Sequence, residues 1–189
     1  MIKKLLIVVF AILILLSGGS YFWYKDINNN LTQSENEIKE HWINIEKEYK
    51  NFAKKVPDLS LLIMDYIKND QQLFDKVSET SKRIDNLTIN IDKFDKQEMK
   101  QYIQLQEEYI DLVNDLVFRV RVYPDLNAEN KFKEIQTQLK DAETNILSAK
   151  IKYNETVLEY NTSIIEFPNY IVADAIGLKG KPYFQAENQ

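Results

Sequence analysis

Apolar side chains recur along this chain at the spacing of amphipathic helices. From Leu31 to Phe52 they return every seven residues, and two aromatic residues fill neighbouring turns. The stripe consists of Leu31, Ile38, Ile45 and Phe52, with Trp42 and Tyr49 beside it. This pattern predicts a helix of about 25 residues. Val56-Pro57 ends it, because a residue that precedes proline is disfavoured in the helical region, and Asp58 can cap the next helix.

Two further helices are predicted from the same kind of stripe. The second is expected on Leu59, Leu62, Tyr66, Leu73, Val77 and Ile84, and the third on Met99, Tyr102, Tyr109, Leu116 and Val120. The segment from Asp85 to Phe94 between them is rich in Asn and Asp and predicts a loop. Asp95 followed by Glu98 resembles a capping box and marks the start of the third helix.

The fourth predicted helix carries the longest periodic pattern. Tyr123-Pro124-Asp125 separates it from the third helix, and Asn127 begins it. Six residues follow one another at intervals of seven, namely Phe132, Leu139, Ile146, Tyr153, Tyr160 and Phe167. So long a heptad run indicates coiled-coil-like packing. Four amphipathic helices joined by short connections predict an all-α, up-and-down four-helix bundle with long helices.

The first 24 residues predict a membrane anchor. Lys3 and Lys4 precede an uncharged run of 20 residues, from Leu5 to Tyr24, that ends in the aromatic cluster Tyr21-Phe22-Trp23-Tyr24. A helix of that length spans about 30 Å, the thickness of the hydrocarbon core, and aromatic residues are typical of the membrane interface. We therefore expect a single transmembrane helix in residues 1–24 and a helical bundle in residues 25–189, with a C-terminal tail from Pro168.

A cleavable signal peptide is the alternative for this segment, because Ser17 and Gly19 fit the small-residue rule for cleavage after Gly19. We favour a retained anchor, since cleavage would leave the aromatic cluster as an exposed patch. The flanking charges set the orientation. Lys3 and Lys4 slightly outweigh Lys25, which favours the N-terminus inside and the bundle on the extracytoplasmic side of the cell membrane.

A set of residue types in the second half of the chain occurs in one order that is specific to a known family. Two Tyr-Asn pairs, Tyr153-Asn154 and Tyr160-Asn161, lie seven residues apart and therefore on one helical face. The other residues of the set are Tyr123-Pro124-Asp125-Leu126, Phe132, Val157, Phe167-Pro168, Ala173, Gly177 and Tyr183-Phe184. From about Tyr123 to Phe184 the chain resembles the LemA family.

The first half of the chain resembles that family less. It has only a partial match at Asn29, Leu31, Trp42 and Val56-Pro57-Asp58-Leu59. Asn51-Phe52 stands where the family usually has a basic pair, Lys150 replaces an arginine, and Leu178 replaces a phenylalanine. The resemblance implies a membrane anchor and a membrane-protein or envelope-protein partner, but no reaction and no ligand.

Composition excludes several kinds of chemistry. The net charge of -5, without clustered Lys and Arg, argues against a nucleic-acid partner. The chain has no Cys, so disulfides, thiolate catalysis and Cys-based zinc sites are excluded. Only 4 Gly and 4 Pro in 189 residues favour long uninterrupted helices.

Candidate catalytic groups are few. His41 is the one histidine, and a half-buried histidine at a bundle seam is a simpler interpretation than a catalytic triad. A di-metal carboxylate bundle needs Glu-x-x-His, whereas Ile38 precedes His41 by three residues. The acidic ridge Glu107, Asp111 and Asp115 can be a cation site or a solvated face, and we favour the second. We therefore predict a non-enzyme without a catalytic, metal or cofactor site. An enzyme without His or Cys would need convergent carboxylates in a cleft.

The resembling residues are the candidate interaction or structural motif. The motif comprises Tyr153, Asn154, Tyr160, Asn161, Phe167, Pro168, Gly177, Tyr183 and Phe184. Asn154 and Asn161 can hold a ligand or fix the register by bonding a neighbouring helix, and we favour the second. Gly177 is expected to cap a short helix. The tail that contains Tyr183 and Phe184 either contacts the bilayer or a membrane-embedded partner, or folds back to cover the open end of the bundle.

These observations predict a membrane-anchored, non-enzymatic scaffold or protein-interaction protein. Its expected partners are the membrane, a membrane or envelope protein, and a second copy of the chain. The alternative is an extracytoplasmic ligand-binding or sensing module. A deep pocket lined by Asn154, Asn161 and tyrosines would favour that alternative, whereas a solidly packed core with an exposed apolar patch would favour scaffolding.

Overall fold

The chain is helical wherever its structure is described, with no strand in those residues. The computed structural model describes residues 2–64, 66, 71–87, 89, 93 and 96–184, without the side chains of residues 2, 5, 8, 9, 11, 127 and 128. Its helices are α1 (Ile2–Ala53), α2 (Val56–Ile63), α3 (Gln71–Asp85), α4 (Lys96–Arg119), the 3-10 helix η1 (Val120–Val122), α5 (Pro124–Ala128), α6 (Asn130–Ser163) and α7 (Asn169–Ala175). The all-α prediction is confirmed.

These helices belong to two compact units. The first unit consists of Met1–Ile38 and Thr156–Lys181, and the second of Lys39–Glu155 and Pro182–Gln189. The first unit therefore holds the beginning of α1, the end of α6 and α7. The second holds the remainder of both long helices together with α2 to α5.

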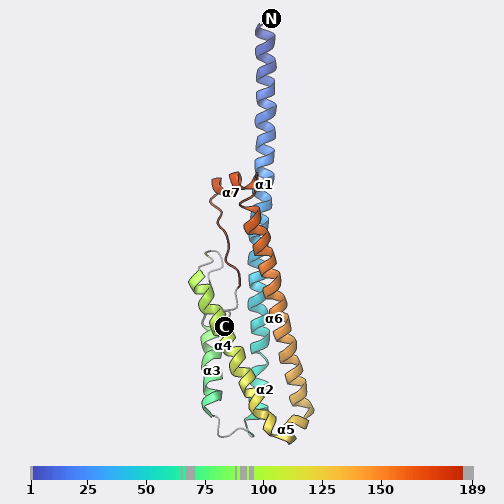
Figure 1. Ribbon diagram of the computed structural model, residues 1–189, viewed down its shortest axis with the longest axis vertical. Helices are drawn as coiled ribbons and strands as arrows, with labels where there is room; N and C mark the ends of the chain where they lie inside the picture. The colour runs from blue at the N-terminus through green and yellow to red at the C-terminus, as the bar shows by residue number, and fades with distance from the viewer. Residues whose placement is uncertain are drawn as a thin grey trace. The chain divides into compact units, whose positions relative to one another are not determined.

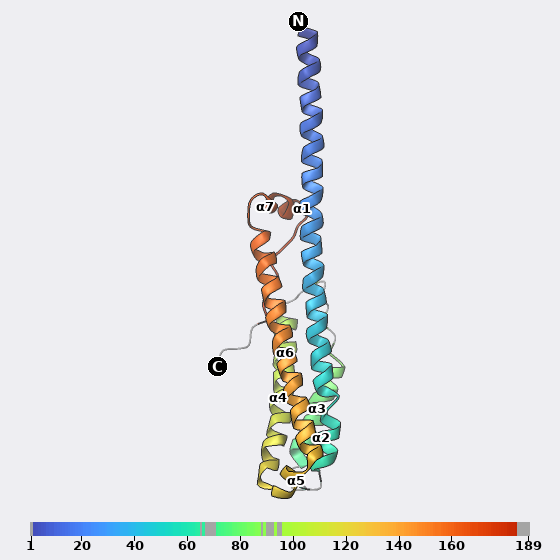
Figure 2. The same cartoon turned by 90° about the vertical axis from the view of Figure 1, so that its right-hand side faces the viewer.

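The second unit is an up-and-down helical bundle. Its four legs are the end of α1 continued by α2, then α3, α4 and α6, and successive legs run in opposite directions (Figures 1 and 2). The apolar stripes face inward as predicted. Buried residues of these stripes are Trp42, Ile45, Tyr49 and Phe52 of α1, Tyr102, Tyr109 and Leu116 of α4, and Phe132, Leu139, Ile146 and Tyr153 of α6.

The predicted second helix is in fact two helices. The first of them, α2, begins at Val56 with Lys55 as its N-cap and no side-chain cap, so the expected capping role of Asp58 is wrong. Pro57 lies in the first turn, where the missing N–H has no helical partner to lose, and the helix continues through it. Tyr66 is exposed outside both helices. Asp95 and half of the predicted loop from Asp85 to Phe94, namely residues 88, 90–92 and 94, lie outside the described residues.

The predicted fourth helix has different ends. The turn from Pro124 forms the short helix α5, which contains Asn127, and α6 begins only at Asn130. At its other end α6 stops at Ser163, so Phe167 lies beyond the helix and is 78% exposed. Its predicted place in the heptad stripe is therefore wrong. A residue before proline is disfavoured in the helical region, which is consistent with an end ahead of Phe167-Pro168.

The N-terminal segment forms the first part of α1. The helix passes through Ser17 and Ser20 without a break, and each hydroxyl donates to a backbone carbonyl of the preceding turn, at 2.9 and 2.8 Å. Among the residues that the structure describes, no helix has both the length and the apolar character that a membrane span requires. The predicted span also includes Leu5, Val8, Val9 and Ala11, whose side chains lie outside the described ones.

Candidate functional site: the Tyr-Asn motif and the C-terminal tail

The first Tyr-Asn pair binds the end of the tail within the second unit. The side-chain Nδ2 of Asn154 donates to the carbonyl oxygen of Phe184 at 2.9 Å, and the backbone N–H of Phe184 donates to Oδ1 of Asn154 at 2.7 Å. The hydroxyl of the preceding residue, Tyr153, donates to the carbonyl of Pro182 at 2.9 Å. These three bonds satisfy tail backbone groups that have no helix or sheet of their own.

The second pair binds the tail in the same way within the first unit. Nδ2 of Asn161 donates to the carbonyl of Lys181 at 2.9 Å, and the backbone N–H of Lys181 donates to Oδ1 of Asn161 at 2.8 Å. A Cβ added to Gly180 would lie 3.3 Å from Oδ1 of Asn161, so the tail backbone approaches the helix closely here. The ammonium group of Lys181 also forms an ion pair with Glu35 of α1.

The spacing of the motif follows from matching a helix to an extended chain. An Asn side chain carries a donor and an acceptor side by side, so it can replace the neighbouring strand that an extended segment would otherwise need. Seven residues of helix rise about 10.5 Å, and three residues of extended chain span about 10 Å. Asn154 and Asn161 are seven apart, and Lys181 and Phe184 three apart. The prediction that these asparagines bond a neighbouring helix is therefore wrong, because their partner is the tail.

The ring of Phe184 completes an aromatic cluster in the second unit. It lies 6.0 Å from the ring of Trp42, which in turn lies 5.3 Å from Tyr102 and 5.8 Å from Tyr153. Trp42 belongs to α1, Tyr102 to α4 and Tyr153 to α6, so the tail closes a junction of three helices. With only 4% of its surface exposed, Phe184 has the position expected of a cover.

Lys150 lies over this cluster. Its Nζ is 4.6 Å from the ring centre of Phe184 and 5.4 Å from that of Tyr49, distances that allow cation–π attraction. Burial lowers the pKa of the Lys150 ammonium, and the carboxylate of Glu107, 3.9 Å away, partly offsets that effect. Lys150 thus packs against the rings of Phe184 and Tyr49. The sequence alone shows only that it replaces an arginine of the family.

Two buried tyrosine hydroxyls near the motif have no hydrogen-bond partner among the described residues, those of Tyr49 and Tyr160. Burial raises the pKa of Tyr160 to about 12, with a further contribution from the charge of Glu35. Burial likewise raises the pKa of Tyr49, and the neighbouring Tyr102 and Glu107 add to the shift. Both hydroxyls are therefore less acidic than a solvated tyrosine and stay protonated at neutral pH.

Gly177 caps α7, as predicted. Its φ of 73° is left-handed, which suits glycine. The N–H of Leu178 donates to the carbonyl of Ala173 at 2.9 Å, and the N–H of Gly177 to that of Asp174 at 3.1 Å. This pair of bonds is the Schellman motif. Phe167 and Tyr183 are exposed and Pro168 is half-buried, so these three motif residues do not join the buried contacts.

Comparison with known protein families finds a match that includes the motif. Residues 41–189 match the LemA family, a range that includes both Tyr-Asn pairs and the tail residues that they bind. The chain belongs to the LemA family. No curated protein matches it.

In this LemA-family chain, His41 and the acidic ridge of Glu107, Asp111 and Asp115 are the other candidate groups. His41 is half-buried beside the buried Trp42. Of the acidic ridge, Glu107 lies near Lys150, and Asp115 pairs with Arg119 at 3.2 Å. Over the described residues, no group of three His, Asp or Glu side chains is arranged to hold a metal ion.

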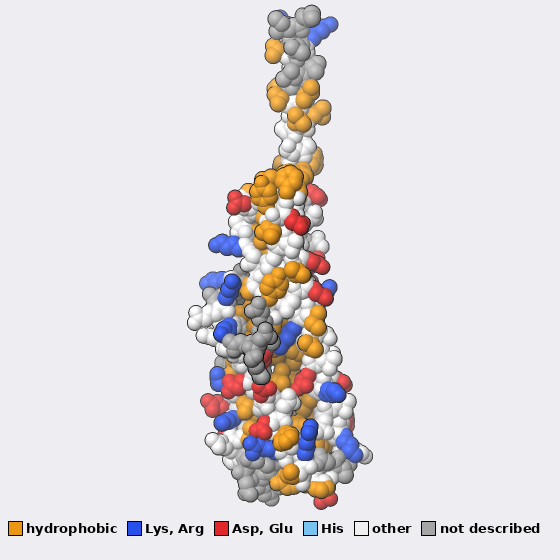
Figure 3. Space-filling model, in the orientation of Figure 1, with side chains coloured by type: hydrophobic (Ala, Val, Ile, Leu, Met, Phe, Trp, Pro, Cys, Tyr) orange, Lys and Arg blue, Asp and Glu red, His pale blue; other side chains and the backbone are white. Residues whose placement is uncertain are grey.

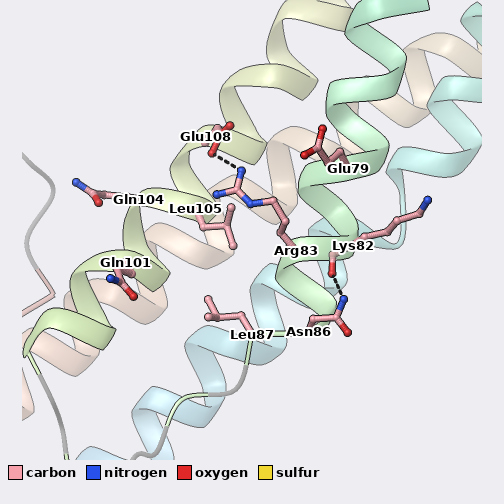
Figure 4. Close-up of a pocket in the computed structure, with 9 residues that line it drawn as sticks. All are labelled: Glu79, Lys82, Arg83, Asn86, Leu87, Gln101, Gln104, Leu105 and Glu108. Atoms are coloured by element: carbon pink, nitrogen blue, oxygen red, sulfur yellow. Dashed lines mark hydrogen bonds and ion pairs between the residues drawn. The ribbon is translucent and has the colours of Figure 1, made fainter.

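An open groove of about 630 Å³ lies between α3 and α4 of this family member (Figure 4). It contains none of the motif residues. Arg83 and Glu108 pair across it at 3.3 Å, and the side chains of both are about half exposed. Its lining residues are Glu79, Lys82, Arg83, Asn86, Leu87, Gln101, Gln104, Leu105 and Glu108. The groove is open to solvent, unlike the clefts that bury most of a small molecule's surface.

Lys181 is the residue of the LemA-family tail whose role the sequence interpretation missed. It contributes both a backbone pair with Asn161 and an ion pair with Glu35. The sequence did hold a signal for this role. Lys181 precedes Phe184 by three residues, and three residues of extended chain span about the same length as the seven helical residues that separate Asn154 from Asn161. Using it requires knowing that the tail is extended and antiparallel to α6, which no periodic pattern in residues 179–184 indicates.

Proposed function

We propose that this LemA-family chain is a membrane-anchored, non-enzymatic scaffold that binds other membrane or envelope proteins. The engagement of Asn154 and Asn161 by the chain's own tail carries the proposal. Because their amide donors and acceptors are already paired with the tail, these asparagines are not the free polar groups that would orient a ligand in a pocket.

Exposed apolar side chains support the membrane anchor. The side chains of Leu6, Ile7, Phe10, Ile12, Leu13, Ile14, Leu15, Leu16, Tyr21 and Phe22 are all exposed on the beginning of α1. Figure 3 shows hydrophobic side chains along this part of the helix. So much apolar surface is costly in water and favourable in lipid. With Lys3 and Lys4 on the cytoplasmic side, the helical bundle then lies on the extracytoplasmic side of the cell membrane.

A second apolar surface supports protein binding. Leu147 and Ile151 of α6, both in the second unit, are four residues apart and are 58% and 50% exposed. Ile146 and Tyr153 on the same helix are buried and face the core. A stripe at this spacing is how an amphipathic helix meets a partner helix or an apolar groove. A partner protein, or a second copy of this chain, would cover it.

Photo-crosslinking in native membranes tests this proposal. A photoreactive amino acid at Ile151 of the full chain is expected to give discrete products with membrane or envelope proteins. The matched control is the same amino acid at Lys140, an exposed position of the same helix. Leu147→Gln with Ile151→Gln should abolish co-purification of the crosslinked protein without lowering the melting temperature. Absence of protein products, together with a small molecule that raises the melting temperature, would instead establish the ligand-binding or sensing module.

A further inference from the structure

The corner where α6 passes into α7, in the first unit, exposes an unusual amount of apolar surface. Ile165 and Phe167 are 73% and 78% exposed. Tyr170 and Ile171, at the start of α7, are also exposed. Hydrophobic side chains gather in this region of the molecular surface in Figure 3. These four side chains are called the apolar corner below.

The apolar corner is a shaped surface held by local bonds. The Nδ2 of Asn169 donates to the hydroxyl of Ser163 at 2.9 Å, and the N–H of Tyr170 donates to the carbonyl of Glu166 at 2.9 Å. The rings of Phe167 and Tyr170 lie 6.4 Å apart. On the inner side, Ile164, Val172 and Ala173 are buried. The segment is therefore amphipathic, with one side packed within its unit and the other turned outward.

Its position along α1 identifies what covers it. The aromatic residues up to Tyr24 are exposed, and the first buried side chain of α1 among those described is that of Ile27, followed by Leu31. Ile27 is three residues after Tyr24, a rise of about 4.5 Å along the helix. Figures 1 and 2 both place α7 beside α1. The packed part of the first unit thus begins next to the aromatic end of the proposed anchor.

We propose that the apolar corner inserts into the interfacial layer of the same bilayer that holds α1. This inference rests on the proposed membrane anchor, which fixes the aromatic residues Tyr21 to Tyr24 at the interface. Aromatic and aliphatic side chains at the end of a membrane helix favour that layer, where the rings meet both headgroups and acyl chains.

Charge indicates that insertion is driven by apolar contact. Glu166 and Asp174 are exposed next to the corner, and Lys179 is exposed beyond Gly177. This mixed set gives no net positive surface to attract anionic headgroups. The corner should therefore enter a bilayer of zwitterionic phosphatidylcholine, and its insertion should not weaken as the salt concentration rises.

Site-directed spin labelling tests this proposal directly, because the chain has no native Cys. Phe167→Cys and Lys140→Cys are labelled in the full chain and reconstituted in phosphatidylcholine vesicles. We expect the Phe167 label to be protected from a water-soluble relaxing reagent and accessible to oxygen, whereas the Lys140 label stays accessible to the water-soluble reagent. Equal access of that reagent at both positions would overturn the proposal.

A third label separates this inference from the anchor on which it rests. Leu13→Cys reports on α1 within the predicted span. A Leu13 label in the hydrocarbon with a Phe167 label in water would overturn the corner and leave the anchor intact, and two labels in water would overturn both. Protection at Phe167 with spin–spin broadening between chains would assign the surface to a second copy and also overturn the lipid contact. Phe167→Ser with Tyr170→Ser should remove protection of a label at Ile165→Cys while the melting temperature in detergent holds.

Discussion

Asn154 and Phe184 are 30 residues apart in the chain, yet they exchange two hydrogen bonds, at 2.7 and 2.9 Å. Both bonds join the side-chain amide of Asn154 to the backbone of Phe184. They leave the Phe184 ring free to pack, and it does so against Trp42 and beneath the ammonium group of Lys150. A family motif that looks like a polar binding site is therefore the means by which the chain holds its own C-terminal tail.

Replacing Asn154 by Ala should release the end of the tail. Two hydrogen bonds contribute about 1–3 kcal/mol to stability, which corresponds to a fall in melting temperature of about 2–4 °C per kcal/mol for a chain of this size. Hydrogen exchange at the Phe184 amide should accelerate. Asn114→Ala is the matched control, because the exposed Asn114 amide donates to the carboxylate of Glu143 in a solvent-exposed hydrogen bond. Unchanged exchange at Phe184 would show that the tail is held by other contacts.

The two aromatic residues at the end of the tail should differ sharply when truncated. Phe184→Ala removes a buried ring from the aromatic cluster and should cost about 3–5 kcal/mol. Tyr183→Ala removes a ring that is 36% exposed and should cost far less. Urea unfolding of each single variant measures the difference. Equal stabilities would contradict the covering role of Phe184 and revive the expectation that both rings contact a membrane or a partner.

The core could be read from the sequence because burial follows the helical period. Leu31, Ile38, Ile45 and Phe52 are buried, and so is every residue of the α6 stripe from Phe132 to Tyr160. The predictions that failed concern the ends of helices, where one local sequence preference competes with another. The first helix does end ahead of Pro57, at Ala53. Asp58, however, does not cap the next helix, because proline is tolerated in the first helical turn and α2 already begins at Val56. Phe167 continues the heptad spacing in the sequence, but α6 stops at Ser163. Beyond the end of the helix, a spacing of seven residues no longer places a side chain on the buried face.

The candidate site could be read only in part. The two Tyr-Asn pairs were correctly placed on one helical face, since that depends on the helix alone. Their partner depends on where an extended segment lies, and such a segment has no periodic signal. The pairing of Lys181 with Glu35 also joins residues 146 positions apart, so it becomes visible only when the tail is placed.

Neighbouring substitutions on α6 should separate its buried face from its exposed one. Ile146 is 2% exposed and Leu147 is 58% exposed. Ile146→Asp places an unpaired charge in the core and should unfold the bundle, because a buried charge without a partner costs several kcal/mol. Leu147→Asp also replaces an aliphatic side chain with a carboxylate, but at an exposed position, so this variant should melt near the wild-type temperature. Thermal melts followed by circular dichroism measure both, and a wild-type melt for Ile146→Asp would show that the helix faces another way.

Stability should fall at alkaline pH. Burial is the largest cause of a raised pKa in Tyr49, Tyr102, Tyr109, Tyr153 and Tyr160. Unfolded tyrosine ionises near pH 10, whereas Tyr160 in the folded chain ionises at about 12. The contribution of the protonated Tyr160 to folding stability is therefore complete below pH 10 and is lost as the pH rises from 10 through 12. Lys150 opposes this trend, because burial lowers its pKa, but it is outnumbered.

Tyr160→Phe gives this pH dependence a specific test. The hydroxyl of Tyr160 has no hydrogen-bond partner among the described residues, so its removal should leave stability at pH 7 nearly unchanged or slightly improved. Denaturant unfolding between pH 9 and 12 should then show a shallower loss than in the wild type (these values bracket the ordinary pKa of about 10). An identical slope in both proteins would mean that Tyr160 does not resist ionisation in the folded state.

The N-terminal segment should be retained in the mature protein. If Leu5 to Tyr24 anchors the chain, cleavage after Gly19 would remove most of the apolar run and release the bundle. Intact mass spectrometry of protein from the membrane fraction should find an N-terminus at Met1 or Ile2. Replacing both Ser17 and Gly19 with Leu, which removes the small residues that a signal peptidase needs, should leave the mass changed only by the substitutions. A wild-type terminus at Ser20 would establish the signal peptide and overturn the anchor.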